Sequence, residues 1–429
     1  MLITVALIVL FLLVVAGVPV AAILGVVALV ISEFFAFFPL TAAIGEVSWS
    51  ASAEFMLLAV PMFILMGEIL TKSGMTDRMY TALDAWFNRL PGGVMHTNIA
   101  AATMFAATSG SSVATAATIG TVSLSNIERY GYNPRLFLGS LAAGGTLGIL
   151  IPPSINMVLY GMLANTSVTD LYMASIIPGL VLAAMFSAAI FIACVLRPSW
   201  SGRIQNYTWR ERITGLRHLL PPLLLFLVVV GTIYGGLATP SEAAAMGVIA
   251  ALCIAFAGGG LSTANLIAAF EGTMRTTCMI MLIIVVALFL NFCLGSLGVT
   301  ETILAIVKHM ELGKYELLLI LVIIYLILGC FMDPISMMVS TAPIVIPLVV
   351  AVGFDPVWFG VVFMILSEAG MITPPIGVNL FVVQSLRRTG EFRDVAIGSL
   401  PFLLMMLVCI LVITVWPQIV LWLPKVLAR

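Results

Sequence analysis

The chain has 429 residues, of which 62% are hydrophobic and 9% are charged, and its formal net charge is −1. Soluble domains carry about 25% charged residues because their surfaces must be solvated, so this composition excludes a water-soluble globule. It predicts instead a surface that mostly faces lipid. The net charge says nothing about nucleic acid, but no basic stretch alternates with aromatic residues, so no nucleic-acid partner is expected.

The predicted elements are all helical and begin with two membrane helices within residues 2–32. This apolar stretch is too long for one span at about 1.5 Å rise per residue, and Gly17 and Pro19 divide it. Six further single spans are predicted, at 53–71, 170–196, 219–238, 241–258, 276–297 and 396–423.

Four other apolar stretches are interrupted. Residues 134–165 and 356–386 each contain a proline pair, which predicts a broken helix. Residues 92–126 and 315–350 have polar or helix-breaking middles, which are typical of re-entrant hairpins. The fold class predicted is therefore an all-α polytopic membrane protein with about ten spans, two re-entrant hairpins and broken helices.

The longest polar loop predicts the orientation in the membrane. It holds five arginines: Arg197, Arg203, Arg210, Arg212 and Arg217. Basic loops favour the cytoplasmic side, so this loop is placed in the cytoplasm. The loops at 39–52, 166–169 and 353–356 contain no Lys or Arg and then lie outside, as do both termini.

These elements divide the chain into five predicted parts. They are N-terminal scaffold spans (1–52), a first repeat (53–197), a cytoplasmic basic loop (198–218), further scaffold spans (219–258) and a second repeat (259–429). Each repeat includes an amphipathic arm helix, at 75–90 and 299–314, which we expect to lie along the membrane interface.

A shift of 222 residues superposes the two repeats. It places Gly131-Tyr-Asn-Pro134 on Gly353-Phe-Asp-Pro356, and Pro152-Pro153 on Pro374-Pro375. The predicted topology puts the first of these turns inside and the second outside, and arginines flank the first turn alone. The repeat is therefore predicted to be inverted, which is typical of secondary transporters.

The proline pairs predict local chemistry as well as a break. Two consecutive prolines remove two amide donors, so the helix must unwind, and unwound backbone at membrane depth is tolerated where it lines a cavity. The freed carbonyls suit a hard cation such as Na⁺. A simple kink is the structural alternative.

The two hairpin tips supply further oxygen atoms. The first reads Thr108-Ser-Gly-Ser-Ser112, and the second reads Met332-Asp-Pro-Ile-Ser336, with Ser111 and Asp333 at equivalent positions. A carboxylate this deep in the membrane needs a partner, and a cation is expected at Asp333. The alternative for the first tip is a close contact between small residues of two helices.

Cysteine and histidine usage predicts no transition-metal centre, disulfide framework or enzyme cofactor. The six cysteines lie in apolar stretches without a CxxC pair, and the three histidines are scattered. Glu368 is a weaker candidate cation ligand, whereas Glu54, Glu68 and Glu242 are interpreted as solvated residues near span ends.

Six short motifs, taken in order, resemble the large membrane subunit of TRAP (tripartite ATP-independent periplasmic) transporters. They are TSGSS at 108–112, GYNP at 131–134, GILIPPSI at 148–155, DPIS at 333–336, GFDP at 353–356 and GMITPPIGVN at 370–379. The resemblance covers essentially the whole chain, and the paired proline motifs are specific.

The resemblance implies an elevator-type, sodium-coupled transporter of the ion-transporter superfamily in the bacterial inner membrane. It implies three partners: a small membrane subunit on another chain, a periplasmic substrate-binding protein, and an organic acid such as a C4-dicarboxylate or a sialic acid. Carried over, the sodium ligands are Ser109, Ser111, Gly148, Ile151 and Pro153 in one site and Asp333, Gly370, Thr373 and Pro375 in the other. Substrate contacts are expected from Ser112, Asn156, Ser336 and Asn379.

Several alternatives stay open at this point. A membrane-embedded hydrolase would use Ser111 or Asp333 as nucleophile, although no GxGD motif or helix-borne Ser–His pair occurs. A carrier coupled to protons rather than sodium, and a structural assembly protein, are further possibilities. An ATP-driven permease is disfavoured because the sequence contains no Walker motif.

Overall fold

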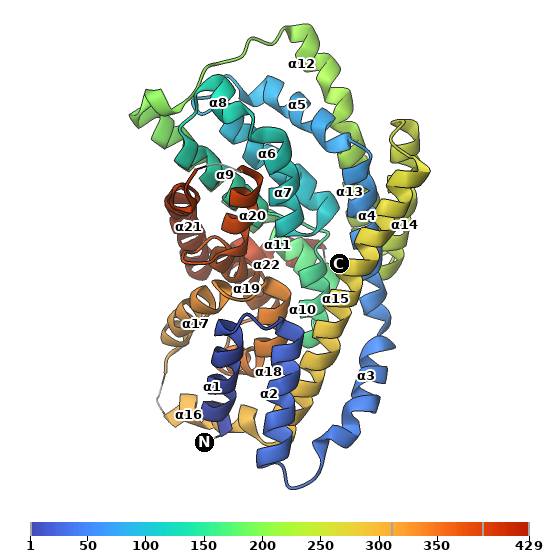
Figure 1. Cartoon of the computed structure of the whole chain (residues 1–429), viewed down its shortest axis with the longest axis vertical. Coiled ribbons are helices and arrows are strands. Elements are labelled where there is room, and N and C mark those ends of the chain that lie inside the picture. The colour runs from blue at the N-terminus through green and yellow to red at the C-terminus, as the bar shows by residue number, and fades with distance from the viewer. Residues whose placement is uncertain (1, 310–311, 388–389, 428–429) are drawn as a thin grey trace.

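The computed structural model describes residues 2–309, 312–387 and 390–427, and these fold into helices joined by short turns. One group of mutually packed helices forms a scaffold. Its members are α1 (Leu2–Val15), α2 (Val20–Phe35), α3 (Ile44–Ser52), α4 (Ala59–Lys72), α13 (Leu220–Tyr234), α14 (Pro240–Ala257) and α15 (Thr263–Ser296), with the short turns η1 (Leu40–Ala43) and η2 (Phe55–Leu58). In Figure 1, α3, α4, α13 and α14 form the right-hand side of the molecule.

A second group, here called the two-repeat bundle, packs beside the scaffold. From the first repeat it contains α6 (Val94–Ser109), α7 (Ser112–Ser123), α8 (Asn126–Tyr130), α9 (Pro134–Thr146), α10 (Ile155–Leu163) and α11 (Val168–Leu196). From the second it contains α17 (Lys314–Gly329), α18 (Pro334–Ala351), α19 (Pro356–Met371), α20 (Val378–Arg387), α21 (Phe392–Val415) and α22 (Gln418–Leu427).

The two repeats interlace within this bundle. α9 of the first repeat lies backbone to backbone on α21 of the second, because Gly139 and Gly398 leave no side chain between them. Conversely, α19 of the second repeat packs on α11 of the first at Gly360, where a Cβ would lie 2.7 Å from Leu171 Cδ2. Small residues allow this close approach between membrane helices.

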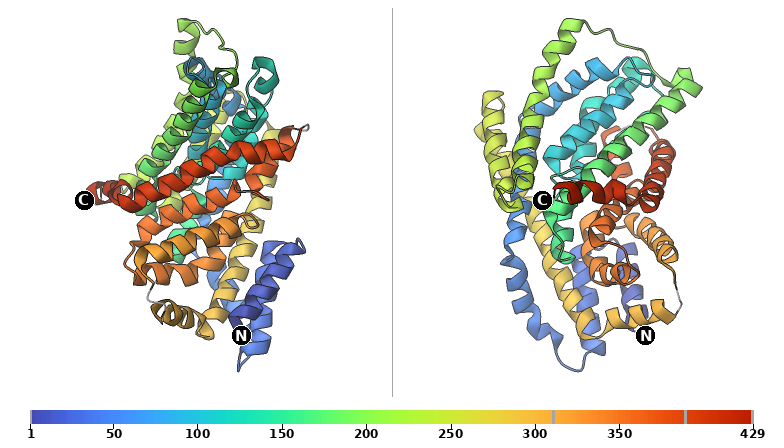
Figure 2. Two further views of the ribbon diagram at one scale, coloured as in Figure 1. Left: turned by 90° about the vertical axis from the view of Figure 1, so that its left-hand side faces the viewer. Right: turned by 180° about the vertical axis from the view of Figure 1, so that it is seen from behind.

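The arm helices α5 (Met75–Phe87) and α16 (Val299–His309) lie at opposite ends of the molecule (Figures 1 and 2). α5 leads into the α6–α7 hairpin, and α16 precedes the α17–α18 hairpin. Equivalent arms at opposite ends are the arrangement that an inverted repeat requires. Residues 310–311, which the predicted second arm included, lie outside the described part of the chain.

The equivalent G-(Tyr/Phe)-(Asn/Asp)-Pro turns have one structural explanation. Gly131 and Gly353 adopt φ values of 70° and 85°, a left-handed conformation that suits glycine after a helix. Asn133 caps α9 by accepting from Leu136 N, and Asp355 caps α19 by accepting from Val357 N and Trp358 N. The following proline occupies the first helical position, where its missing N–H is not needed.

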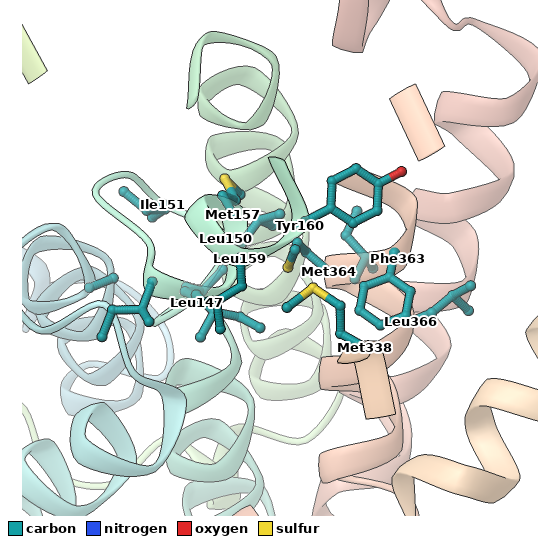
Figure 3. Packing of buried hydrophobic residues seen from close by; sticks show 14 of the residues in the cluster. Leu147, Leu150, Ile151, Met157, Leu159, Tyr160, Met338, Phe363, Met364 and Leu366 are labelled. Atoms are coloured by element: carbon teal, nitrogen blue, oxygen red, sulfur yellow. The ribbon is translucent and has the colours of Figure 1, made fainter. Parts of the chain in front are cut away.

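Buried apolar side chains hold the two broken helices against each other. Leu147, Leu150 and Leu159 of the first repeat and Met338, Phe363 and Leu366 of the second belong to one packed core (Figure 3). Within it, the rings of Tyr160 and Phe363 lie 6.3 Å apart. This core fixes the position of both breaks relative to each other.

The arginine-rich loop between α11 and α13 connects the arm α5 to the bundle. It contains η3 (Pro198–Trp200), α12 (Trp209–Gly215) and η4 (Leu216–His218). Tyr207 donates to the buried carboxylate of Asp84 over 2.7 Å, and Thr97 donates to its other oxygen over 3.2 Å. Burial raises the pKa of Asp84, while these two hydrogen bonds oppose the rise.

The structure confirms the helical membrane architecture and changes some predicted bounds. Seven described helices are long and apolar enough to cross a membrane. The predicted span 396–423 is wrong as one helix, because the chain turns at Trp416–Pro417 between α21 and α22. The loop predicted at 39–52 contains α3, and the span predicted at 276–297 begins earlier, at Thr263.

Candidate functional site

The first hairpin tip is a two-residue turn, Gly110 and Ser111, between α6 and α7. α6 ends at Ser109, and Gly110 takes the left-handed conformation with φ 59°. Ser111 is the N-cap of α7, with its hydroxyl accepting from Ala114 N over 3.4 Å. The Ser109 hydroxyl lies 2.9 Å from that of Thr115. The tip therefore gathers hydroxyl oxygens at the N-terminus of a helix.

The first helix break lies directly against this tip. Residues between α9 and α10, from Leu147 to Ser154, leave the helix as the Pro152–Pro153 pair predicts. A Cβ at Gly148 would lie 2.5 Å from the Ser111 carbonyl oxygen, and a Cβ at Gly110 would lie 3.1 Å from the Pro153 carbonyl oxygen. The structure thus brings Ser109, Ser111, Gly148 and Pro153 together, with Ile151 in the same unwound segment.

The second tip repeats the geometry with a carboxylate. Asp333 is the N-cap of α18 and accepts from Ile335 N and Ser336 N, both over 3.1 Å, as well as from the Ser336 hydroxyl. Part of its hydrogen-bonding capacity is therefore used within the tip. The equivalent residues Ser111 and Asp333 have the same capping role in opposite repeats.

The second break lies against the end of α17, just before its own tip. It separates α19 from α20 at residues 372–377 and contains Thr373 and Pro375. A Cβ at Gly370 would lie 2.5 Å from the Gly329 Cα, and Cys330 Sγ donates to the Thr373 carbonyl over 3.6 Å. Both Pro152–Pro153 and Pro374–Pro375 are cis peptides. In the first repeat the predicted ligands of the break and the tip lie together, whereas in the second the break contacts Gly329 and Cys330, which precede the tip.

Both tips line a single cavity of about 370 Å³ between the two-repeat bundle and the scaffold. The bundle contributes its two tips together with residues near the breaks: Ser109, Gly110, Ser111, Ser112, Val113, Ala114, Ala117, Ile149, Ile155, Asn156, Asp333, Pro334, Ile335 and Met371. The scaffold wall is Ile64, Gly67, Glu68 and Thr71 of α4 and Thr276, Met279 and Ile280 of α15. Such a space, apolar with a few convergent polar groups, is typical of small-ligand sites.

The four predicted substrate contacts fall into two pairs. Ser112 and Asn156 line the cavity. Ser336 is buried behind the second tip, where its hydroxyl donates to Asp333. Asn379 is buried beside the first tip, with its side-chain nitrogen 3.2 Å from the position of a Cβ on Gly145.

Three fully buried polar side chains near the breaks have atoms without a hydrogen-bond partner in the described part of the chain. They are Ser154, Glu368 and Asn379. Glu368 of α19, in the second repeat, contacts Ser112 at the first tip, so this contact connects the two repeats. A buried carboxylate is costly to keep ionised, so it either takes up a proton or is paired with a positive charge. The role of Glu368 as a weaker candidate cation ligand stays a prediction.

The scaffold wall was missed by sequence reasoning. Glu68 was interpreted as a solvated residue near a span end, but it is half-buried and lines the cavity, close to Gly272 of α15. A Cβ at Gly67 would lie 3.1 Å from Ser109 Cα, so the scaffold touches the first tip here. The signal that could have found it is the polar pair Glu68 and Thr71 within an apolar helix.

The donor atoms at this site are hydroxyl, carbonyl and carboxylate oxygens. Within the described residues, no group of three or more His, Cys, Asp or Glu side chains could hold a metal ion. Oxygen ligands of this kind suit hard cations rather than zinc or copper.

Comparison with known proteins identifies the family. Residues 7–419 match the model of "Tripartite ATP-independent periplasmic transporter, DctM component". The C4-dicarboxylate TRAP transporter large permease protein DctM of Pseudomonas aeruginosa is 34% identical over 381 residues, covering 88% of each chain. The ectoine/5-hydroxyectoine large permease UehC of Ruegeria pomeroyi is 31% identical, covering 86% of this chain and 85% of its own. The sialic acid large permease SiaM of Vibrio cholerae is 29% identical, covering 87% of each chain.

Solved structures support the fold. The Alcanivorax borkumensis YdaH transporter superposes with a TM-score of 0.60 at 15% identity and 88% coverage of each chain. The Neisseria gonorrhoeae MtrF efflux pump superposes with a TM-score of 0.58, also at 15% identity, over 97% of this chain and 95% of its own. The related sequences are named as permease subunits, which argues against the hydrolase alternative. The chain therefore belongs to the family of large permease components (DctM) of TRAP transporters, multi-pass proteins of the bacterial inner membrane.

Proposed function

We propose that this subunit imports a small organic acid by sodium-coupled, elevator-type movement of the two-repeat bundle past the scaffold. The observation that supports this most is the shared cavity, where both hairpin tips meet the wall formed by α4 and α15. Each tip is backed by its own helix break, so two similar oxygen-rich shells flank one ligand space.

The residues present fit sodium. In the first shell, the Ser109 and Ser111 hydroxyls lie beside the unwound segment that contains Gly148, Ile151 and Pro153. In the second, the ligands would be the Asp333 carboxylate and the segment with Gly370, Thr373 and Pro375, which Cys330 contacts three residues before Asp333. Bound sodium would supply positive charge at the two tips. Glu368, buried against Ser112 of the first tip, would add negative charge beside that shell when it is ionised.

A small organic anion fits the same arrangement. The amides at the start of α7 can direct partial positive charge toward the cavity, as helix N-termini do, whereas those at the start of α18 donate to Asp333. Ser112 and Asn156 line the cavity and add hydrogen-bonding groups, while Ser336 and Asn379 support the tips from behind. The described lining contains no Lys or Arg, so an anion depends on these dipoles and on the cations beside them.

The contact between scaffold and bundle favours sliding movement. At Gly67, the scaffold helix α4 touches the tip of α6 with no intervening side chain. The two arms join the two groups of helices at opposite ends of the molecule. Rigid movement of one group past the other would carry the cavity along, with the arms as connecting levers.

The family membership indicates three components for activity. We propose that this chain works with a small membrane subunit and a periplasmic binding protein that delivers the substrate. Relatives are named for C4-dicarboxylate, sialic acid and ectoine, and one is a DctMQ fusion named for isethionate. C4-dicarboxylates and sialic acid are therefore the first candidates for this chain.

Uptake into proteoliposomes containing all three components tests this proposal. Radiolabelled C4-dicarboxylate or sialic acid should accumulate when an inward sodium gradient is imposed, and not when potassium replaces sodium. Accumulation driven by a proton gradient in sodium-free buffer would show proton coupling instead. Uptake without any ion gradient would overturn coupled transport.

A further inference from the structure

Two cavities meet at the cytoplasmic edge of the scaffold, away from the site described above. The first, of about 410 Å³, lies between α5 and the loop segment that contains α12 and η4. Its charged or titratable lining residues are Asp77, Arg78, Tyr207, Glu211, Arg217 and His218. The second, of about 340 Å³, lies between the cytoplasmic ends of α13 and α14. Arg78 and His218 line both cavities, so the two spaces adjoin.

The first cavity presents charges of both signs. Arg78 is held by backbone carbonyls, with Nη2 3.2 Å from the Ser73 oxygen and Nη1 3.4 Å from the Gly258 oxygen. Arg217 Nε donates to His218 over 3.3 Å. Neither guanidinium forms an ion pair with a carboxylate in the described residues. Their full positive charges remain directed at the cavity and its surroundings.

Two carboxylates complete the charged lining. Asp77 lies in the first turn of α5. Glu211 uses one oxygen to accept from Thr208 N over 2.7 Å and from the Thr208 hydroxyl over 2.8 Å, which closes the start of α12. The cavity therefore combines two cations and two anions within one wall, a pattern that matches a zwitterion rather than a simple anion.

The second cavity is apolar and opens toward lipid. Leu220 and Leu224 of α13 are 61% and 54% exposed, and Ile254 and Ala257 of α14 face them across the groove. An apolar groove continuous with a charged cavity at the bilayer boundary has the polarity of a phospholipid, tail and head.

We propose that these cavities bind one phosphatidylethanolamine molecule from the cytoplasmic leaflet. Its phosphate lies between Arg78 and Arg217, and its ammonium group lies toward Asp77 and Glu211. One acyl chain follows Leu220 and Leu224 along α13. The lipid then fastens the arm α5 to the scaffold, beside the hydrogen bonds that Arg78 makes to the end of α14. This inference goes beyond the proposed transport function and does not depend on it.

Native mass spectrometry of the purified complex tests the site. After delipidation, the complex is exchanged against phosphatidylethanolamine, phosphatidylglycerol and phosphatidylcholine of equal chain length. Phosphatidylethanolamine should be retained as one tightly bound molecule. Arg217→Ala should lower retention at least fivefold, because Arg217 contacts the phosphate and otherwise bonds only to His218 among the described residues. Leu224→Trp should lower it similarly by filling the tail groove.

Arg210→Ala is the matched control, because Arg210 lies in the same loop, is exposed and does not line either cavity. It should leave retention unchanged. Asp77→Asn should shift the preference from phosphatidylethanolamine toward phosphatidylglycerol, since the partner of the ammonium group is removed. Equal retention by the Arg217 and Arg210 variants, or preferential binding of phosphatidylglycerol to the unmodified protein, would overturn the proposal. So would a cross-link that shows the small subunit covering Leu224.

Discussion

The two hairpin tips have the same backbone role but different chemistry. Ser111 and Asp333 occupy equivalent positions, and each caps the second helix of its hairpin. The first tip turns through Gly110 and carries neutral hydroxyls, whereas the second turns before Pro334 and carries a carboxylate. The two repeats therefore place a side-chain oxygen at the same position, but the oxygen belongs to a neutral hydroxyl in one repeat and to a carboxylate in the other.

This difference suggests unequal shells at the two breaks. A carboxylate attracts a cation more strongly than a hydroxyl does at membrane depth, where the effective dielectric constant is low. The second shell is then expected to hold sodium more tightly, and the first to adjust more readily.

The largest effect is expected at the charged tip. Asp333→Ala should abolish sodium-dependent uptake in proteoliposomes with all three components, because it removes the single negative charge of the tip. Asp355→Ala is the matched control, since Asp355 caps α19 through the same two amide contacts but lies outside the cavity. It should cost about 0.5–2 kcal/mol of stability. If uptake by the Asp333 variant still depends on sodium, the proposed sodium site at the second tip is refuted.

A similarly direct test addresses the contact between the first break and its tip. Gly148→Ala places a Cβ 2.5 Å from the Ser111 carbonyl oxygen and 2.8 Å from the Ser112 Cα. Backbone atoms on both sides must move, so we expect a loss of about 1–3 kcal/mol in stability and at least tenfold slower uptake. Gly231→Ala in α13 meets nothing within 4 Å and should leave uptake unchanged. Equal effects of both variants on uptake would mean that the contact is unimportant.

The neutral tip should respond more mildly. Ser111→Ala removes one hydroxyl ligand and the cap of α7, and we expect the apparent sodium affinity to fall about 3- to 10-fold, or about 0.7–1.4 kcal/mol. A sodium titration of uptake measures this. Asn133→Ala removes the cap of α9 outside the cavity and serves as the comparison. An unchanged titration in the Ser111 variant would argue against the first shell.

The smallest effect is expected at the hydrogen bond from Tyr207 to Asp84, which connects the loop between α11 and α13 to the arm α5. The ionised carboxylate of Asp84 is stabilised by the Tyr207 hydrogen bond, and burial raises its pKa above 3.8. A raised pKa in the folded state means that stability is greatest below the ordinary pKa and is lost as pH rises through the raised value. Tyr207→Phe raises that pKa further, so it should destabilise by about 1 kcal/mol at pH 8 and by less at pH 5. Thermal unfolding of the detergent-solubilised protein at both pH values checks this, and equal losses would contradict it.

Much of the membrane architecture could be predicted from sequence because its signals are local. Proline pairs at 152–153 and 374–375 identified both breaks, and the Gly-to-Pro turns identified the starts of α9 and α19. The turn at Trp416–Pro417 was missed because apolar residues continue across it, and hydropathy alone does not register a change of direction.

The part of the site that sequence reasoning missed comes from long-range packing. Glu68 lines the cavity because α4 crosses the first tip at Gly67, a contact between distant segments that no local pattern contains. Glu368 is buried against Ser112 for a similar reason, since it depends on how the two repeats interlace. The breaks and tips themselves could be predicted because each is marked by a local motif within one repeat, while the ligand set carried over from the resemblance stays a prediction.

The interlaced contact between Gly139 and Gly398 has a consequence for biogenesis. α9 leaves the ribosome and enters the membrane long before α21 has been translated, yet each buries the other's backbone. The surface of α9 around Gly139 therefore stays unpacked in the bilayer until the carboxyl-terminal helices are inserted. If synthesis stops between the two repeats, the surface of α9 that α21 would cover stays exposed, and such a truncated protein is expected to be a substrate for membrane quality-control proteases.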